Sequence, residues 1–237
     1  MKLKFKSAVA AMAVAASAVA YADNTQEKDC VETVGWTPVA VGLASPVQLP
    51  WGLAAWDVYG LDLGLFYTDA PKMYGLDVAG LASVTRCNLS GLQVSGLLNF
   101  GLVDVYGLRA TIGLNLCKAT VYGADLGLVG LREKLVGFDA EFIGSAQHAM
   151  TGMQVAGLAN VVDGEACGCS LALGTNLART VSGAQVALVF NMAEELHGAQ
   201  IGLVNFVDYC PNGFQIGLVN IILSNQVKVL PIVNGCF

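Results

Sequence analysis

The residue types that most often carry out chemistry are few in this chain, and they form no familiar catalytic pattern. The 237 residues include two histidines, His148 and His197, which fall in different segments and lack further ligands at metal-binding spacing. The sequence holds no Gly-x-Ser-x-Gly elbow, phosphate-binding loop or His-Glu-x-x-His pattern. We therefore expect both histidines to lie on the surface.

Two short clusters come nearest to a metal site. Cys167-Gly-Cys169 resembles half of a zinc site, but the sequence supplies no second half. Asp163-Gly-Glu165 lacks the spaced run of oxygen ligands that a calcium loop needs. The sequence thus predicts no catalytic, cofactor-binding or metal-binding residues, no cofactor, and a protein that is not an enzyme.

The seven cysteines raise the question of disulfides. They occupy mostly different positions relative to the glycines described below, so no stacked pair is predicted, and we expect few disulfides and at least one free thiol. Cys169 is expected to point inward as a buried apolar residue. The cysteines are Cys30, Cys87, Cys117, Cys167, Cys169, Cys210 and Cys236.

A repeating unit of about fifteen residues is the most informative feature of the sequence. Its clearest copies are Gly-Ala-Gln-Ile-Gly-Leu-Val-Asn at 198–205 and Gly-Phe-Gln-Ile-Gly-Leu-Val-Asn at 213–220. A short fixed period is typical of repeat architectures. The leading glycines, 14 to 16 residues apart, are Gly60, Gly75, Gly91, Gly107, Gly123, Gly137, Gly152, Gly168, Gly183, Gly198 and Gly213.

Within each unit apolar and small or polar residues alternate, which indicates a strand with two different faces. We expect Phe214, Ile216 and Leu218 to face the core and Gln215 to face outward. Copies with one extra residue before the second Gly-Leu are predicted to contain a β-bulge.

Asparagine and glutamine recur at fixed positions of the unit. If the strands stack in parallel, these amides can form hydrogen-bonded ladders along the stack; the alternative is that the asparagines only form turns between hairpins. The asparagines are Asn99, Asn115, Asn160, Asn176, Asn191, Asn205, Asn220 and Asn234, and the glutamines are Gln93, Gln154, Gln185, Gln200 and Gln215.

Two folds could use one such strand per repeat. The favoured one is an all-β parallel β-solenoid of about 11–12 short coils, and the alternative is an outer-membrane β-barrel. The chain is expected to be exported and ends in Phe237, as in many outer-membrane strands. However, connections of seven or eight residues recur without the alternation of short turns and long loops that is typical of barrels.

Three parts of the chain are predicted. Residues 1–22 look like a signal peptide, with Lys2, Lys4 and Lys6 before an alanine-rich stretch and an Ala-Tyr-Ala cleavage pattern. Residues 23–57 are expected to cap the repeats, and residues 58–237 to form the β-repeat domain, closed by Pro231 at its last edge. The divergent segment 123–150 is expected to be a solvated loop or a partner-binding bulge.

Composition excludes several classes of function. Without the signal, 9 basic and 18 acidic residues remain, a net charge of −9. This acidic balance argues against nucleic acid and against electrostatic binding to anionic lipid. No stretch of the remaining chain is apolar enough for a membrane helix.

The units in 58–234, including the closing Val-Leu-Pro-Ile-Val-Asn at 229–234, resemble those of exported bacterial surface-repeat proteins found in spirochaetes and other Gram-negative groups. That resemblance implies association with the cell surface or outer membrane and no known reaction. We expect the chain to be exported to the periplasm, outer membrane or cell surface of a Gram-negative bacterium. We expect a non-enzymatic scaffold or binding module whose partner is a protein or glycan at the cell surface, with self-association or outer-membrane association as further options. The alternative function is a β-barrel pore.

Overall fold

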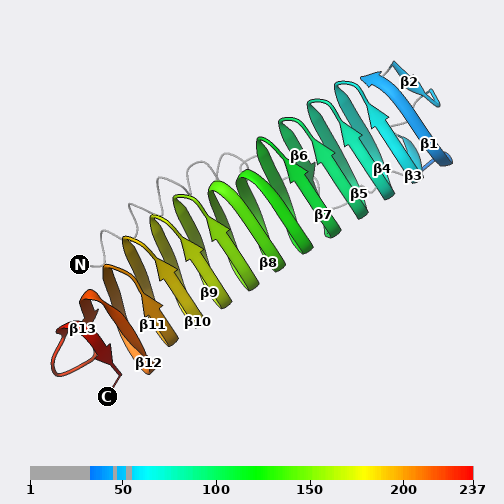
Figure 1. Ribbon diagram of the computed structural model, residues 1–237. Coiled ribbons are helices and arrows are strands. Elements are labelled where there is room, and N and C mark those ends of the chain that lie inside the picture. Colours follow the sequence, from blue (N-terminus) through cyan, green and yellow to red (C-terminus); the bar gives the residue numbers. More distant parts are fainter. Residues whose placement is uncertain (1–32, 45–46, 52–54, 237) are drawn as a thin grey trace. The chain divides into compact units, whose positions relative to one another are not determined.

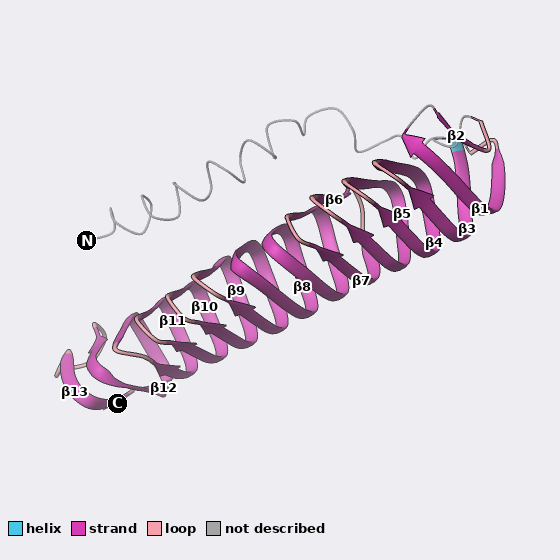
Figure 2. Ribbon diagram, turned by 45° about the horizontal axis from the view of Figure 1, so that its top comes forward, coloured by secondary structure: helices cyan, strands magenta, loops and turns pink. Residues whose placement is uncertain are grey.

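The computed structural model describes residues 33–44, 47–51 and 55–236, so the predicted signal peptide at 1–22 lies outside the described residues. The chain divides into two compact units. Unit 1 extends to Glu133, and unit 2 extends from Lys134 to the C-terminus. Both consist almost entirely of β-strands (Figures 1 and 2).

The strands follow one another around short coils. Unit 1 contains β1 (Gly35–Ala44), β2 (Val47–Leu49), β3 (Trp56–Gly64), β4 (Tyr67–Ala79), β5 (Ala82–Ser95), β6 (Leu98–Gly101) and β7 (Val105–Thr111). The long strand β8 (Leu114–Ala156) has residues in both units. Unit 2 continues with β9 (Ala159–Ala172), β10 (Thr175–Ala187), β11 (Phe190–Ile201), β12 (Val204–Ile222) and β13 (Val229–Gly235).

Successive coils pair in parallel and in register with the sequence repeat. Gly60 lies opposite Gly75 in unit 1, and Asn176 opposite Asn191 in unit 2. This arrangement confirms the predicted parallel β-solenoid. It contradicts the alternative of an outer-membrane barrel, in which consecutive strands would run antiparallel.

The leading glycines are required by the backbone. Ten of the described glycines in this column have φ between 123° and 144°, a conformation that residues with a side chain rarely adopt. A Cβ at Gly183 would also lie 2.1 Å from the carbonyl oxygen of Gly168 in the previous coil. Gly183 therefore lies at a turn of its coil, directly against the equivalent glycine of the previous coil.

The two faces of the repeat are the reverse of the prediction. Gln215 is fully buried, whereas Phe214, Ile216 and Leu218 are 44%, 40% and 67% exposed. The alternation correctly separates two faces, but the assumption that the apolar face points inward is wrong. In this narrow interior the planar amides stack and bond to one another, and the larger apolar side chains are left outside.

Other positions supply the apolar core. The residue two before the leading glycine is buried in ten coils, and only the exposed Pro211, before Gly213, departs from this pattern. Several small residues on neighbouring inward positions are also buried, including Ala79, Ala156, Ala178 and Ala193. The first set consists of Val58, Met73, Leu89, Val105 and Val121 in unit 1, and Leu135, Met150, Ala166, Val181 and Leu196 in unit 2. The coils thus combine an apolar column with polar columns in their interior.

The extra residue of the longer repeats lies at a corner and not within a paired strand. Val186 pairs with Ile201 and Phe190 with Val204, so the additional residue is absorbed in the turn between them. The predicted β-bulge at this place is therefore wrong. Register shifts occur elsewhere in the coil, for example between Ala178 and Thr180 where β10 pairs with β9.

The chain reverses direction at the end of unit 2. Strand β13 pairs antiparallel with β12, which places Asn234 opposite Gln215 and outside the parallel asparagine column predicted for it. A disulfide joins Cys210 to Cys236, whose Cα atoms are 5.5 Å apart. This reversal covers the edge of the last coil, as expected for a cap.

Candidate functional site

The two histidines lie at the surface of the coils. His148 is exposed, and the Nε2 atom of His197, also exposed, lies 3.0 Å from Glu195 Oε1. Cys167 Sγ lies 3.2 Å from Glu165 Oε1. The hydrogen bond to Glu165 raises the pKa of the Cys167 thiol, and burial raises this pKa further. The surface position predicted for both histidines is confirmed.

The cysteines divide into bonded and free residues. Cys87 is disulfide-bonded, as are Cys210 and Cys236. Free thiols are present at Cys117, Cys167 and Cys169, which confirms the prediction of at least one. Cys169 is half-buried on the outward face, so its predicted inward position is wrong.

A column of buried polar and charged side chains runs through each unit, two residues after the leading glycine. The sequence pattern revealed its glutamines but missed its charged members, although they keep the same offset from glycine. In unit 1 this polar column contains Asp62, Asp77, Gln93, Arg109 and Asp125, and in unit 2 Asp139, Gln154, Ser170, Gln185, Gln200 and Gln215. All are at most 2% exposed.

The first aspartates of the polar column form a strongly perturbed pair. Asp62 and Asp77 lie opposite each other in neighbouring coils. Burial, followed by the charges of Asp77 and Asp69, raises the pKa of Asp62 to about 7. Burial also raises the pKa of Asp77, although hydrogen bonds from Ser83, Thr68 and Gln93 oppose that increase. Burial therefore disfavours the charged form of both carboxyls.

Farther along unit 1 the charges are compensated. Arg109 donates to Asp125 Oδ2 at 2.6 Å, and Arg132 lies 3.0 Å from the same oxygen. All three side chains have no exposed surface, so this ion triad has no access to solvent ligands. We assign it a structural role.

The divergent segment 123–150 is neither a loop nor a bulge. It lies entirely within β8, and Arg132 and Glu141, two of the charges that suggested a solvated loop, are buried. Ser145, and not Gly144, lies opposite Asn160 and occupies the asparagine position. The predicted loop is therefore wrong, because glycine and charge at these positions fit inside the coil.

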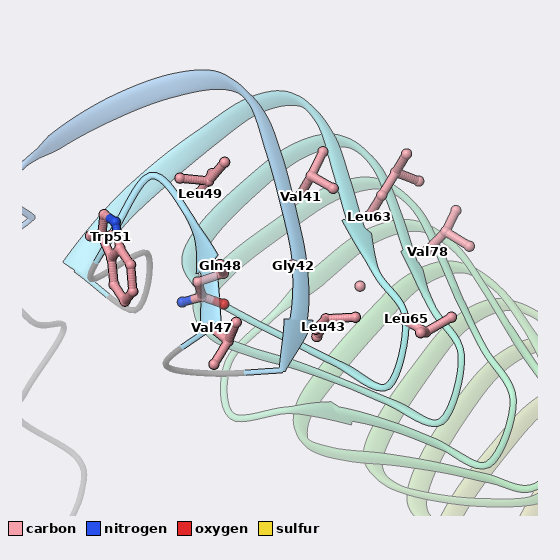
Figure 3. A pocket seen from close by; sticks show the side chains of 11 residues that line it. Val41, Gly42, Leu43, Val47, Gln48, Leu49, Trp51, Leu63, Leu65 and Val78 are labelled. Atoms are coloured by element: carbon pink, nitrogen blue, oxygen red, sulfur yellow. The ribbon is translucent and has the colours of Figure 1, made fainter.

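An apolar groove of about 700 Å³ lies beside β1 and β2, within the size range of ligand pockets (Figure 3). Figure 3 shows side chains from β1 to β4 around it, together with Trp51. Outward positions paired across neighbouring coils, such as Val41 and Leu63, form part of its wall. The lining residues are Val41, Gly42, Leu43, Val47, Gln48, Leu49, Trp51, Leu63, Gly64, Leu65 and Val78. The groove is thus where the apolar outer surface of unit 1 meets β2.

The outer surface of unit 2 carries the clearest candidate site. One leucine stands at the same corner of each of five successive coils. Four of them lie in the short loops between strands at 157–158, 173–174, 188–189 and 202–203, and the fifth lies within β12. We call this row the leucine corner: Leu158, Leu173, Leu188, Leu203 and Leu218, which are 62%, 67%, 64%, 44% and 67% exposed. Leu65, Leu81 and Leu97 occupy the corresponding corner of unit 1 and are also exposed.

Charge is absent from the sequence around the leucine corner. The stretches 155–160, 171–176, 186–191, 201–205 and 216–220 contain no acidic or basic residue. The charged residues of these coils follow the asparagine and form surface pairs such as Arg179 with Asp163, 2.9 Å apart. The others are Glu165, Glu194, Glu195 and Asp208. Apolar and charged surfaces are therefore separated around each coil.

Comparison with protein-family models, curated proteins and solved structures gives no match. Within the described part of the chain, no helix has the length and hydrophobicity needed to cross a membrane. The candidate site is therefore defined by the geometry of this chain alone.

Proposed function

We propose that this chain is an exported, non-enzymatic repeat protein of the Gram-negative envelope that acts as a binding scaffold. The leucine corner of unit 2 is the contact surface in this proposal. The parallel β-solenoid is compatible with such a role. The signal-like N-terminus and the resemblance to surface-repeat proteins support export.

The observation that carries the proposal is the repetition of an exposed leucine. A buried residue can recur because every coil needs the same packing. Leu173 and Leu188 are about two-thirds exposed and contribute little to the core, so packing does not explain why leucine recurs at this corner. Exposed apolar residues that form a continuous row usually mark an interaction site.

A photo-crosslinking residue placed at Leu188 in producing cells tests this function. The matched control carries the same residue at Thr180 in β10, the strand that ends directly before Leu188, and this position lies directly opposite Glu195 of the next coil. We expect the chain in the envelope fraction, with adducts formed from position 188 and not from position 180. Retention in the cytoplasm, or equal labelling from both positions, would contradict the proposal.

A further inference from the structure

We propose that the leucine corner of unit 2 binds a second copy of this chain, leucine corner against leucine corner. The inference rests on the proposed function, because it names the partner of the same surface. Three properties of the corner support it: its spacing, its shape and its lack of charge.

The spacing of the leucines matches that of another copy. Neighbouring parallel strands lie about 4.8 Å apart, so the corner presents one leucine per coil at about that interval. The row shifts between two adjacent positions: Leu158, Leu203 and Leu218 lie two residues before the asparagine of their coil, and Leu173 and Leu188 lie three residues before it. A second copy carries a row with the same interval and can keep contact over all five coils. A two-fold axis makes such a contact self-complementary, as in most dimers. A partner without this period could match only one or two leucines.

The shape of the corner is suited to interdigitation. Glycine stands next to leucine in four of the five coils, as Gly157-Leu158, Leu173-Gly174, Gly202-Leu203 and Gly217-Leu218. In these four coils the projecting leucine therefore has a neighbour in the chain without a side chain. A facing leucine can lie against the glycine, which is the packing that excludes water from paired rows of identical strands.

The surface around the row is large enough for a stable contact. Val189, Ile201, Ile216 and Val219 flank the leucines and are 38–48% exposed. Specific interfaces bury roughly 800 Å² on each partner. A strip two or three residues wide along five coils is of that order.

Charge favours this corner over other approaches of two copies. The chain has a net charge of −6, so two copies repel wherever their acidic residues face each other. When two copies meet at the leucine corner, Asp163, Glu165 and Glu195 lie on other parts of their coils and outside the contact. No carboxylate is then buried or brought against another.

Sedimentation velocity of the whole chain over about a hundredfold range of concentration tests the proposal, because dimers dissociate on dilution. The test variant is Leu173→Glu with Leu188→Glu. The control is Thr151→Glu with His197→Glu, which adds the same charge at two exposed positions outside the corner. We expect a dimer for the wild type and control, and a dimer Kd raised at least 100-fold in the test variant.

A charge-reversal experiment separates a second copy from other partners. Leu173→Lys with Leu188→Lys should also be monomeric, but mixing it with the glutamate variant should restore a mixed dimer. Circular dichroism checks that both variants keep the β-sheet signal. A monomeric wild type, unchanged dimerisation of the glutamate variant, or no mixed dimer would overturn the proposal. Two results would contradict only the second copy and leave the proposed function intact. One is the capture of another protein by photo-crosslinking at Leu188. The other is a monomeric wild type that binds vesicles of phosphatidylcholine.

Discussion

The side-chain amide of Asn191 donates a hydrogen bond to Asn205 Oδ1 in the next coil, 2.9 Å away. The same nitrogen donates to the backbone carbonyl of Ile201 at 2.8 Å, and Asn191 Oδ1 accepts from Asn176 at 3.0 Å. Every neighbouring coil of this part of unit 2 is linked in this way. The predicted asparagine ladder is therefore confirmed, and it holds both the stack and the corner of each coil.

The glutamine ladder runs in the opposite direction. Gln215 donates to Gln200 Oε1 at 2.8 Å, and Gln200 donates to Gln185 Oε1 at 2.9 Å. The asparagines donate toward the C-terminal coils and these glutamines toward the N-terminal ones. Because the two rows of amide dipoles are opposed, their fields partly cancel, which suits a buried interior with few compensating charges.

Replacing Asn191 by alanine should break the ladder at its centre. The change leaves Asn176 without its side-chain acceptor and the buried Asn205 oxygen without its donor, at about 1–3 kcal/mol for each unsatisfied group. Asn212→Ala is the matched control, because Asn212 is exposed. We expect a lower urea midpoint for Asn191→Ala and little change for the control. Equal midpoints for the two variants would show that the ladder contributes nothing to stability.

Replacing Gly183 by alanine should be more damaging than its small size suggests. Its φ of 144° is strained for alanine, and the new Cβ would overlap the carbonyl oxygen of Gly168. Gly101 is the comparison, since its φ is not positive and a Cβ there would meet side-chain atoms no closer than 3.2 Å. We expect Gly183→Ala to lose at least about 3 kcal/mol of unfolding free energy or to misfold. Similar melting temperatures for the two variants would contradict this steric account.

Asp62 should make the protein less stable as the pH rises. Its carboxyl has a pKa of about 7 when folded and 3.8 as the ordinary value, so the folded state holds the proton more tightly. The associated stability is complete below about pH 4, decreases between pH 4 and 7, and is lost above pH 7, with a total of up to about 4 kcal/mol. Unfolding midpoints measured from pH 4 to 8 should show this decline.

Asp62→Asn should remove most of that decline, because the amide stays neutral at every pH. Asp208→Asn is the control, since Asp208 is exposed. It should keep the pH dependence of the wild type. A wild-type protein whose stability rose steadily from pH 4 to 8 would show that Asp62 is ionised in the folded state.

The fold could be predicted from the sequence because the positions of the leading glycines follow from the conformation of the backbone. Only glycine fits where the coil turns with positive φ against another glycine, so the period of Gly168, Gly183 and Gly198 is the period of the coils. The amide rows follow the same register and predicted the ladders. The direction of the faces could not be obtained in this way. Alternation shows which residues share a side, and burying Gln200 while exposing Ile201 depends on ladder bonds made only in the stack.

The candidate site could not be predicted for the same reason, because the sequence did not show which face of each strand points outward. Leu218 of the leucine corner alternates with small residues in its repeat, which predicted a core residue, but the structure places it outside. Arg109 and Asp125 could have been assigned to the polar column from their distance to the leading glycine. Their pairing could not, because it requires knowing that this column is buried. The disulfide of Cys210 was equally hidden, since β13 reverses and leaves the repeat register.

The buried ion triad should show an order of mutational costs. Arg109→Gln leaves Asp125 with Arg132 as a partner, whereas Asp125→Asn removes the carboxylate that both arginines contact. Breaking a buried ion pair costs about 3–5 kcal/mol, so Asp125→Asn should approach or exceed that range and Arg109→Gln should cost less. Guanidinium would screen these charges, and urea unfolding is therefore the measurement.

Asp163→Asn provides the exposed counterpart, because it removes a surface ion pair with Arg179 whose side chains are about half exposed. Such pairs contribute up to about 1 kcal/mol, and that contribution decreases with salt. We expect the order Asp125→Asn, then Arg109→Gln, then Asp163→Asn, with salt affecting only the last. If Arg109→Gln were the most damaging of the three, Arg109 would stabilise the coil mainly through its 3.0 Å bond to the Leu116 carbonyl and not through the triad.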